Sequence, residues 1–133
     1  TDKKIRLFEN EDKNKISIKK SPEIVYGLRN FIGNAVKFSD KEVNIKLTSN
    51  DQTLVLTIND DGPGFAEDIT KLIGEPYLKS KSKKVRGKSG LGLGIFLGKT
   101  LLETKKARLV FSNNEELRGA SVKISWDIVD IKN

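Results

Sequence analysis

Hydrophobic residues recur every three or four positions between Pro22 and Phe38. Such spacing places them along one side of a helix, as packing against a core requires. Ser21 suits the N-cap position, proline suits the first turn, and Glu23 lies near the positive end of the helix dipole. The pattern therefore predicts a helix over residues 22–38. Its core-facing side would carry Ile24, Leu28, Phe31, Ile32, Ala35 and Phe38.

Apolar and polar residues alternate in two consecutive segments on either side of a turn at Asn50 and Asp51. This is the pattern of a β-hairpin that is apolar on one face. Shorter segments near the two ends of the chain also favour extended structure. The predicted strands cover residues 5–8, 15–19, 43–47, 54–58, 107–112 and 120–128.

A glycine-rich stretch, Gly90-Leu-Gly-Leu-Gly94, leads into an apolar segment that predicts a helix over residues 91–105. Gly98 lies inside this helix, where glycine is less favourable than alanine. Before it, residues 66–73 predict a short helical piece. Residues 74–89, rich in glycine, serine and lysine, predict a mobile loop. The residues expected to face inward in the longer helix are Leu93, Leu97, Leu101 and Leu102.

The predicted order of elements is two strands, a helix, two strands, a loop, a helix and two strands. This is an α+β pattern in which helices cover one face of a sheet. The chain has 133 residues, without an internal repeat or a linker-like segment. We therefore expect a single domain over residues 1–133.

Composition excludes several kinds of chemistry. The chain contains no cysteine and no histidine, so disulfides, thiolate metal sites and imidazole bases are excluded. It shows neither a signal-peptide pattern nor an apolar run long enough to span a bilayer. It also contains no methionine, even at position 1. We therefore expect a piece of a longer protein.

The formal charge of +7 comes from one short segment, Lys79–Lys88, which holds six basic residues and no acidic one. Without that segment, 19 basic residues face 18 acidic residues in the rest of the chain. A local excess of this kind favours an anion such as a phosphate chain over a broad nucleic-acid footprint.

Two amides and an ammonium group share one strip of the first predicted helix. Asn30, Asn34 and Lys37 are spaced i, i+4 and i+7, which places them on the same side. An amide oxygen can bind Mg²⁺, and Lys37 can neutralise phosphate. A solvated helix side would explain the same pattern equally well.

The loop Asn59-Asp-Asp-Gly-Pro-Gly64 follows a predicted strand. It is either an ordinary turn or a ligand site. In the second case Asp60 would accept a hydrogen bond from an exocyclic amine, and Gly62 and Gly64 would let the backbone approach a flat base. The glycines before the second helix leave backbone N–H groups open, which suits phosphate binding at a helix N-terminus.

Together, in order and spacing, these segments resemble the nucleotide-binding boxes of sensor histidine kinases. Asn30-Phe-Ile-Gly-Asn-Ala-Val-Lys-Phe38 resembles the N box, Asp60-Asp-Gly-Pro-Gly64 the first glycine box, and Gly90-Leu-Gly-Leu-Gly94 the second. Gly74-Glu-Pro-Tyr77 lies where an aromatic box is expected. The resemblance spans residues 22 to about 126 and implies the catalytic and ATP-binding domain of such a kinase. That superfamily includes gyrase B, MutL and a heat-shock chaperone.

A finer resemblance is to the RegB/PrrB group of redox-responsive kinases. It rests on Gly74-Glu-Pro-Tyr77, on the segment from Gly92 to Glu103, and on Gly119-Ala120 followed by Trp126. The fold implied by the family is a two-layer α/β sandwich. Its mixed, mostly antiparallel sheet is covered on one face by about three helices.

The resemblance also implies roles for individual residues. Asp60 would bind the adenine amino group, Asn34 would bind Mg²⁺ with Asn30 nearby, and Lys37 would contact phosphate. Residues 74–89 would form the lid over ATP. The other implied nucleotide-binding residues are Phe38, Gly62, Gly64, Tyr77, Lys79, Gly90, Leu91, Gly92, Leu93 and Gly94.

The function implied is binding of Mg-ATP and donation of its γ-phosphate to a histidine on a separate dimerisation domain, which this chain lacks. A response regulator would act downstream. ATPases of the superfamily carry a glutamate where this chain carries Asn30. An amide cannot take a proton, so hydrolysis of ATP should be poor. We expect the isolated chain to be a soluble cytoplasmic monomer that cannot autophosphorylate, and its parent to be anchored in the inner membrane.

Other functions fit part of the pattern. An anti-sigma protein-serine kinase of the same fold would need an acceptor serine on a partner. A nucleic-acid-binding module would use Lys79–Lys88, but none of the nine aromatic residues interleaves with that run, so no nucleic acid is expected. The third alternative is a domain that holds nucleotide only as a structural or regulatory ligand. The presence of both Asn34 and Asp60 argues against it.

Overall fold

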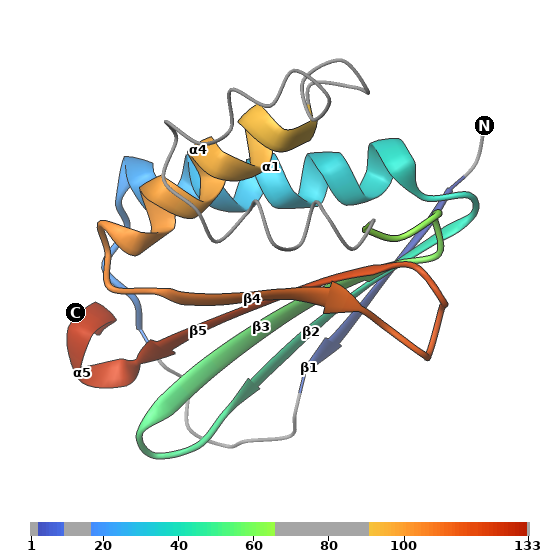
Figure 1. Cartoon of the computed structure of the whole chain (residues 1–133). Coiled ribbons are helices and arrows are strands. Elements are labelled where there is room, and N and C mark those ends of the chain that lie inside the picture. The colour runs from blue at the N-terminus through green and yellow to red at the C-terminus, as the bar shows by residue number, and fades with distance from the viewer. Residues whose placement is uncertain (1–2, 10–16, 66–90, 133) are drawn as a thin grey trace.

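The computed structural model of the chain describes residues 3–9, 17–65 and 91–132. These residues form a five-stranded sheet with the strand order β1-β2-β3-β5-β4 (Figure 1). The edge strand β1 runs parallel to β2, and the other neighbouring pairs are antiparallel. The strands are β1 (Lys4–Glu9), β2 (Glu42–Ser49), β3 (Thr53–Asp60), β4 (Arg108–Asn113) and β5 (Ala120–Asp127).

Two long helices cover one face of this sheet and run beside each other (Figure 1). They are α1 (Pro22–Phe38) and α4 (Leu91–Glu103). The short helix α5 (Ile128–Ile131) follows β5 at the opposite end of the chain from β1. The α+β class, the mixed and mostly antiparallel sheet, and the placement of the helices on one face confirm the fold expected from the sequence.

The helix α1 begins where its sequence predicts. The Ser21 hydroxyl accepts a hydrogen bond from the backbone N–H of Ile24, at 3.2 Å. This bond satisfies one of the N–H groups that the first helical turn leaves free. Phe31 and Ala35 are buried on the face of α1 that meets the sheet. Ile24, Leu28 and Ile32 pack around them and are partly buried.

The strands alternate between a covered face and an open face. In the β2–β3 register, Val43 pairs with Asp60, and both side chains are buried under the helices. The next pair, Asn44 and Asn59, points to the opposite face, because successive strand residues alternate sides. Both asparagines are nevertheless buried, with 3% and 6% of their surface exposed. Something other than the helix layer must therefore cover them.

The helices α1 and α4 approach each other closely where glycines face across the contact. A Cβ on Gly27 would lie 2.6 Å from Cγ of Leu102, and one on Gly98 would lie 3.0 Å from Cε2 of Phe31. Both distances are below ordinary van der Waals contact. Gly98, unfavourable within a helix by itself, is therefore explained by packing against α1.

This packing corrects one prediction about α4. The sequence predicts that Leu97 faces inward, but 51% of its surface is exposed. The inward positions are instead Ile95, Gly98 and Leu102, because the glycine takes the side of the helix that meets α1. The prediction for Leu102 is correct, and Leu101 is partly buried.

Other predictions about local structure have mixed outcomes. The strand expected at residues 15–19 is wrong in its described part, where Ile18 makes only an isolated antiparallel bridge with Lys132. The helix α5 is not predicted by the sequence pattern. The expected helical piece at 66–73 and the loop at 74–89 lie outside the described residues.

Candidate nucleotide-binding site

The polar strip of α1 faces the first turns of α4. A Cβ on Gly94 would lie 3.6 Å from Asn30 Oδ1 and 3.7 Å from Asn34 Nδ2. The structure thus brings Asn30 and Asn34 together with one glycine of the second glycine-rich segment, as the sequence predicts. Because glycine has no side chain, the backbone of α4 is open toward the two amides at this point.

Asn34 has unused hydrogen-bonding capacity. Its Nδ2 atom is buried and has no hydrogen-bond partner among the described residues. A buried donor without a partner costs stability, so such a group in a folded protein often has a ligand or a functional role. An amide offers a nitrogen donor for a phosphate oxygen and an oxygen that can bind a hard cation.

Asp60 ends β3 as a buried carboxylate, with 5% of its surface exposed. Its Oδ1 accepts hydrogen bonds from the backbone N–H groups of Gly62, at 2.9 Å, and Ala120, at 3.2 Å. Within the described residues, both hydrogen bonds to its carboxylate reach Oδ1. The second oxygen, Oδ2, receives no hydrogen bond from this part of the chain and is suited to accept one from a ligand.

Burial raises the pKa of Asp60 above its ordinary value of 3.8, although the backbone donors of Gly62 and Ala120 act in the opposite direction. The neighbouring negative charge of Asp61 adds a smaller upward effect. A buried carboxyl group with an oxygen open to a ligand is typical of a functional site, since burial alone is unfavourable for the charged form.

The neighbouring carboxylate, Asp61, has a structural role instead. It accepts hydrogen bonds from the backbone N–H groups of Asp40, Lys41 and Glu42, at 2.8 to 3.1 Å. Burial acts to raise the pKa of Asp61, but these backbone bonds outweigh it and hold the pKa below 3.8. Asp61 therefore ties the loop after β3 to the segment that joins α1 and β2.

The glycines of the loop after β3 allow close backbone contacts. A Cβ on Gly62 would lie 2.2 Å from the carbonyl oxygen of Phe38, so only glycine fits against the end of α1. Gly64 has a φ of +82°, in the region that favours glycine. The loop carrying Asp60 is thereby fixed beside the last residue of the helix that carries Asn34 (Figure 1).

Lys37 and Phe38 lie at the C-terminal end of α1. The Lys37 Nζ atom is 5.3 Å from the centre of the Phe38 ring, within cation–π range. Lys37 is exposed, and Phe38 is partly exposed. Of the other expected nucleotide-binding residues, Leu91, Gly92 and Leu93 begin α4, while Tyr77, Lys79 and Gly90 lie outside the described residues.

Sequence reasoning missed residues that shape the Asp60 environment from the far end of the chain. The Asn113 side chain bonds both backbone groups of Phe65, with Oδ1 accepting at 2.7 Å and Nδ2 donating at 3.0 Å. A Cβ on Gly119 would lie 2.2 Å from the Asp60 carbonyl oxygen. In the sequence, the dipeptide Gly119-Ala120 contributes only to the resemblance to the RegB/PrrB group. No local pattern marks it as part of the site.

The described residues contain no cluster of three or more histidine, cysteine, aspartate or glutamate side chains that could hold a metal ion. A fully protein-built metal cage is therefore not found in this part of the chain. The donor set does fit Mg²⁺ held mainly by phosphate oxygens and water, with an amide oxygen such as that of Asn34 as a protein ligand.

Comparison with known proteins adds an independent line of support. Residues 19–129 match the family described as histidine kinase-, DNA gyrase B- and HSP90-like ATPase. The chain is also 34% identical over 126 residues to the sensor histidine kinase RegB of Cereibacter sphaeroides. That match covers 84% of this chain and 27% of RegB, so the chain spans about a quarter of this relative.

Solved structures show the same fold at low sequence identity. The mycobacterial sensor histidine kinase MprB has a TM-score of 0.69 at 20% identity, covering 93% of this chain and 80% of that one. The ATP-binding domain of PrrB from Mycobacterium tuberculosis has a TM-score of 0.62 at 18% identity, covering 90% and 76%. Across the described residues, no helix combines the length and apolar character that a membrane-spanning segment needs.

Proposed function

Because the chain belongs to the histidine kinase-, DNA gyrase B- and HSP90-like ATPase family, we propose that it is the ATP-binding catalytic domain of a sensor histidine kinase. The observation that carries the proposal is the buried carboxylate of Asp60, whose Oδ1 is occupied by two backbone donors. Its remaining oxygen suits a ligand that donates a hydrogen bond, as the adenine amino group does.

The phosphates of ATP would lie between the C-terminal half of α1 and the start of α4. Support comes from the unpaired Asn34 Nδ2 and from the open approach that Gly94 leaves beside Asn30 and Asn34. Lys37 is exposed nearby and supplies a point charge for phosphate. The backbone N–H groups at the start of α4, over residues 91–94, would add donors and a favourable dipole.

Mg²⁺ would bind to the side-chain oxygen of Asn34 and to ATP itself, where it neutralises phosphate charge. The positively charged residues of the expected lid, including Lys79, would act on the same charge. Tyr77 and Phe38 would flank the nucleotide, and Gly62 and Gly64 would shape the adenine pocket. Phosphoryl transfer depends mainly on such positioning and charge neutralisation.

The phosphate acceptor must lie on another domain. The chain contains no histidine, so phosphohistidine cannot form on it. Asn30 stands where a catalytic glutamate would activate water in the ATPases, and an amide cannot serve as a base. The γ-phosphate would therefore await a histidine on a dimerising helical domain of the parent protein, with a response regulator as the later acceptor. Like RegB, the parent would be several times longer than this chain.

A transfer assay tests this function. The chain is mixed with Mg-ATP labelled on the γ-phosphate and with the histidine-bearing helical fragment of the same parent protein. Label should appear on that fragment as an acid-labile, base-stable phosphoramidate, and should be absent from the chain itself. Two control reactions should leave the fragment unlabelled: one uses a helical fragment with its histidine replaced by glutamine, and the other uses the chain with Asp60→Ala.

Two other results would contradict the histidine kinase assignment in different ways. Acid-stable label on a serine of a partner would indicate a protein-serine kinase of the same fold. Absence of transfer to a proven cognate fragment, with ATP binding intact, would indicate a domain that holds nucleotide without donating its phosphate.

A further inference from the structure

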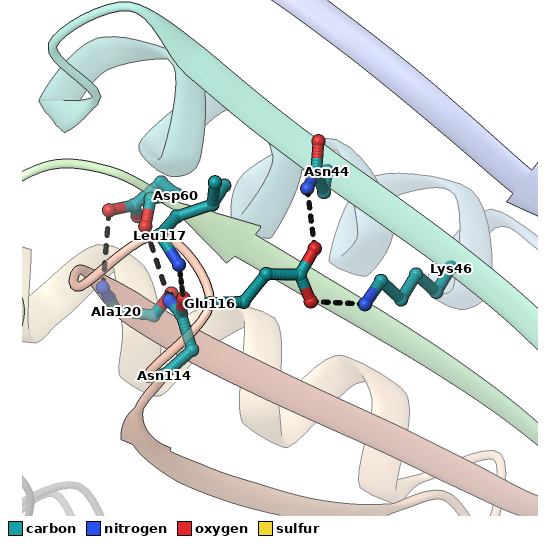
Figure 2. A network of polar contacts seen from close by, with 7 residues as sticks. All are labelled: Asn44, Lys46, Asp60, Asn114, Glu116, Leu117 and Ala120. Carbon is teal, nitrogen blue, oxygen red and sulfur yellow. Dashed lines mark hydrogen bonds and ion pairs between the residues drawn. The ribbon is translucent and has the colours of Figure 1, made fainter.

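The connection between β4 and β5, residues 114–119, is fastened to the rest of the fold in two places (Figure 2). The first fastening is made by Asn114. Its Nδ2 donates to the carbonyl oxygens of Asp60, Gly119 and Ala120, at 3.2, 2.9 and 2.9 Å. The Asn114 amide thus joins the first residue of the connection to its last residue, Gly119. The same amide also binds the connection to the backbone of Asp60, the proposed adenine-binding residue.

The second fastening is made by Glu116. One carboxylate oxygen, Oε1, accepts a hydrogen bond from Asn44 Nδ2 at 2.9 Å, and the other, Oε2, pairs with Lys46 Nζ. Both partners lie on β2, which is separated from β5 by β3 in the sheet. The side chain of Glu116 therefore reaches across β3 (Figure 2).

This reach gives a partner to one of the two asparagines buried on the face of the sheet that the helices leave open. Asn44 and Asn59 form a register pair on that face. Asn44 is 3% exposed, and Glu116 is its described side-chain partner. The Asn44 Oδ1 atom remains buried without a partner among the described residues. Among the described residues, Glu116 is therefore the partner of the Asn44 amide nitrogen, and the amide oxygen has none.

The ion pair favours a charged Glu116. The hydrogen bond from Lys46 has the largest effect on the Glu116 carboxyl, and the bond from Asn44 has the next largest. Together they hold the pKa of this carboxyl below its ordinary value of 4.5. A charge-assisted bond of this kind is stronger than a neutral one. Both side chains of the pair remain partly exposed, so its importance lies in where it holds the connection rather than in a large contribution to stability.

The connection ends at the Asp60 carboxylate. The backbone N–H of Ala120 donates to Asp60 Oδ1 at 3.2 Å. A Cβ on Gly119 would lie only 2.5 Å from the same oxygen. A small displacement of this segment would therefore remove a hydrogen bond from the carboxylate or push against it.

We propose that Glu116 is a positioning residue for adenine recognition: through Lys46 and Asn44 it holds the β4–β5 connection so that Ala120 orients the Asp60 carboxylate. This inference rests on the proposed function, because it assigns Asp60 to the adenine amino group. Glu116 reaches Asp60 only through the connection. Its effect should therefore fall on discrimination between bases rather than on phosphate binding.

Binding of two nucleotides tests the proposal. Non-hydrolysable analogues of ATP and of inosine triphosphate differ at the ring position where adenine carries its amino group. Glu116→Ala should reduce the preference for the adenine analogue by about fivefold, the scale expected when one ordinary hydrogen bond is weakened. Glu116→Gln, which keeps an acceptor for Asn44, should retain part of the preference. Glu115→Ala removes the neighbouring exposed carboxylate and is the matched control, with wild-type behaviour expected.

Hydrogen exchange supplies a readout that needs no nucleotide. The amides of Ala120 and Gly62 both donate to Asp60 Oδ1, but only Ala120 adjoins the connection. Glu116→Ala should speed exchange at Ala120 and leave Gly62 unchanged. Lys46→Gln, which breaks the ion pair from β2, should give the same result if Glu116→Ala folds poorly.

Three outcomes would overturn the proposal. One is wild-type discrimination in Glu116→Ala, and another is equal weakening of both nucleotides, which would indicate general loosening. The third is unchanged exchange at Ala120. A wild-type chain that binds neither nucleotide would instead contradict the proposed function, and the exchange measurement would still decide the role of Glu116.

Discussion

The two ends of the α1–α4 pair are built in opposite ways. At one end, Leu102 packs against Gly27 and Phe31 packs against Gly98, so closely that neither glycine has room for a Cβ. At the other end, Gly94 faces Asn30 and Asn34 with room for ordinary contact. The first end is closed by apolar packing, and the second keeps a buried amide nitrogen without a partner among the described residues.

This difference separates stability from ligand binding within one pair of helices. Substitutions at the packed end should lower the free energy of unfolding, because overpacking forces neighbours to shift. Substitutions of Asn30, Asn34 or Gly94 at the polar end should leave stability unchanged or raise it, because that end holds groups whose burial is unfavourable. They should instead weaken nucleotide binding. Such a trade between activity and stability is common at functional sites.

The largest contrast is expected between two glycines of α1. Gly27→Ala should lower the free energy of unfolding by about 1–2 kcal/mol, since overpacking by the new methyl group outweighs the gain in helix propensity. Gly33→Ala should raise it by about 1 kcal/mol, because nothing lies within 4 Å of a Cβ at that position. Urea unfolding can be followed by fluorescence of the single tryptophan, Trp126, which is 3% exposed. Equal effects of the two substitutions would contradict the close approach of the helices.

The second contrast is between two adjacent carboxylates, Asp60 at the end of β3 and Asp61 directly after it. The pKa of Asp60 is raised in the folded state, so its contribution to stability is greatest below pH 3.8 and is lost as the pH rises through the folded value. Asp60→Asn should therefore be more stable than the wild type at neutral pH, with the difference shrinking below pH 3.8.

Asp61 should behave in the opposite way. Its pKa is lowered, so its contribution is present above pH 3.8 and is lost as the pH falls through the folded value. Asp61→Asn should be less stable than the wild type at neutral pH. Urea midpoints measured from about pH 3 to neutral pH would show both trends. Stabilisation by both substitutions would contradict the division of roles.

A third contrast compares two glycines of α4. Gly98→Ala should destabilise the fold by roughly 0.5–1 kcal/mol, because a methyl group 3.0 Å from the Phe31 ring costs more than the gain in helix propensity. Gly94→Ala should leave stability equal or higher, and should weaken binding of an ATP analogue by placing a methyl group toward Asn30 and Asn34. Thermal unfolding and nucleotide titration of both variants separate the two effects. Undiminished nucleotide binding by Gly94→Ala would contradict the placement of the phosphates.

The smallest effect on stability is expected for Asn34→Ala, within about 1 kcal/mol of the wild type, since removing a buried donor without a partner offsets the packing lost with the side chain. Asn44→Ala is a useful comparison, because Asn44 donates to Glu116 and its loss should be clearly destabilising. Calorimetric unfolding of the two variants checks the order, and a larger loss for Asn34→Ala would assign that residue a structural role.

The sequence correctly predicts those helices and strands that are determined by residues close to one another in the chain. The cap at Ser21 and the apolar spacing after it correctly predict α1, and the alternation around Asn50 predicts the β2–β3 hairpin. The motifs around Asn30 and Gly94 are adjacent in the structure, where Asn30 and Asn34 face Gly94, but the roles expected for these residues stay predictions. The parallel pairing of β1 with β2 is not specified by local pattern, because partner choice between strands depends on contacts distant in sequence.

The failures have the same origin. Leucine side chains are usually buried, so the sequence predicts that Leu97 faces inward. In the structure, α1 packs closely against the face of α4 that carries Gly98, and Leu97 is exposed. Asn114 and Glu116 lie in a polar connection with no motif. They approach Asp60 and β2 only after the sheet has formed, so no local pattern marks them.

Calorimetric titration of the chain with a non-hydrolysable ATP analogue, with and without Mg²⁺, tests the central claim most directly. We predict saturable one-to-one binding that is lost in Asp60→Ala and is weakened in Asn34→Ala only when Mg²⁺ is present. Asp51→Ala, which removes an exposed carboxylate in the β2–β3 turn, should bind as the wild type does. Binding that survives Asp60→Ala, or no binding by the folded wild type, would contradict the assignment of this site to ATP.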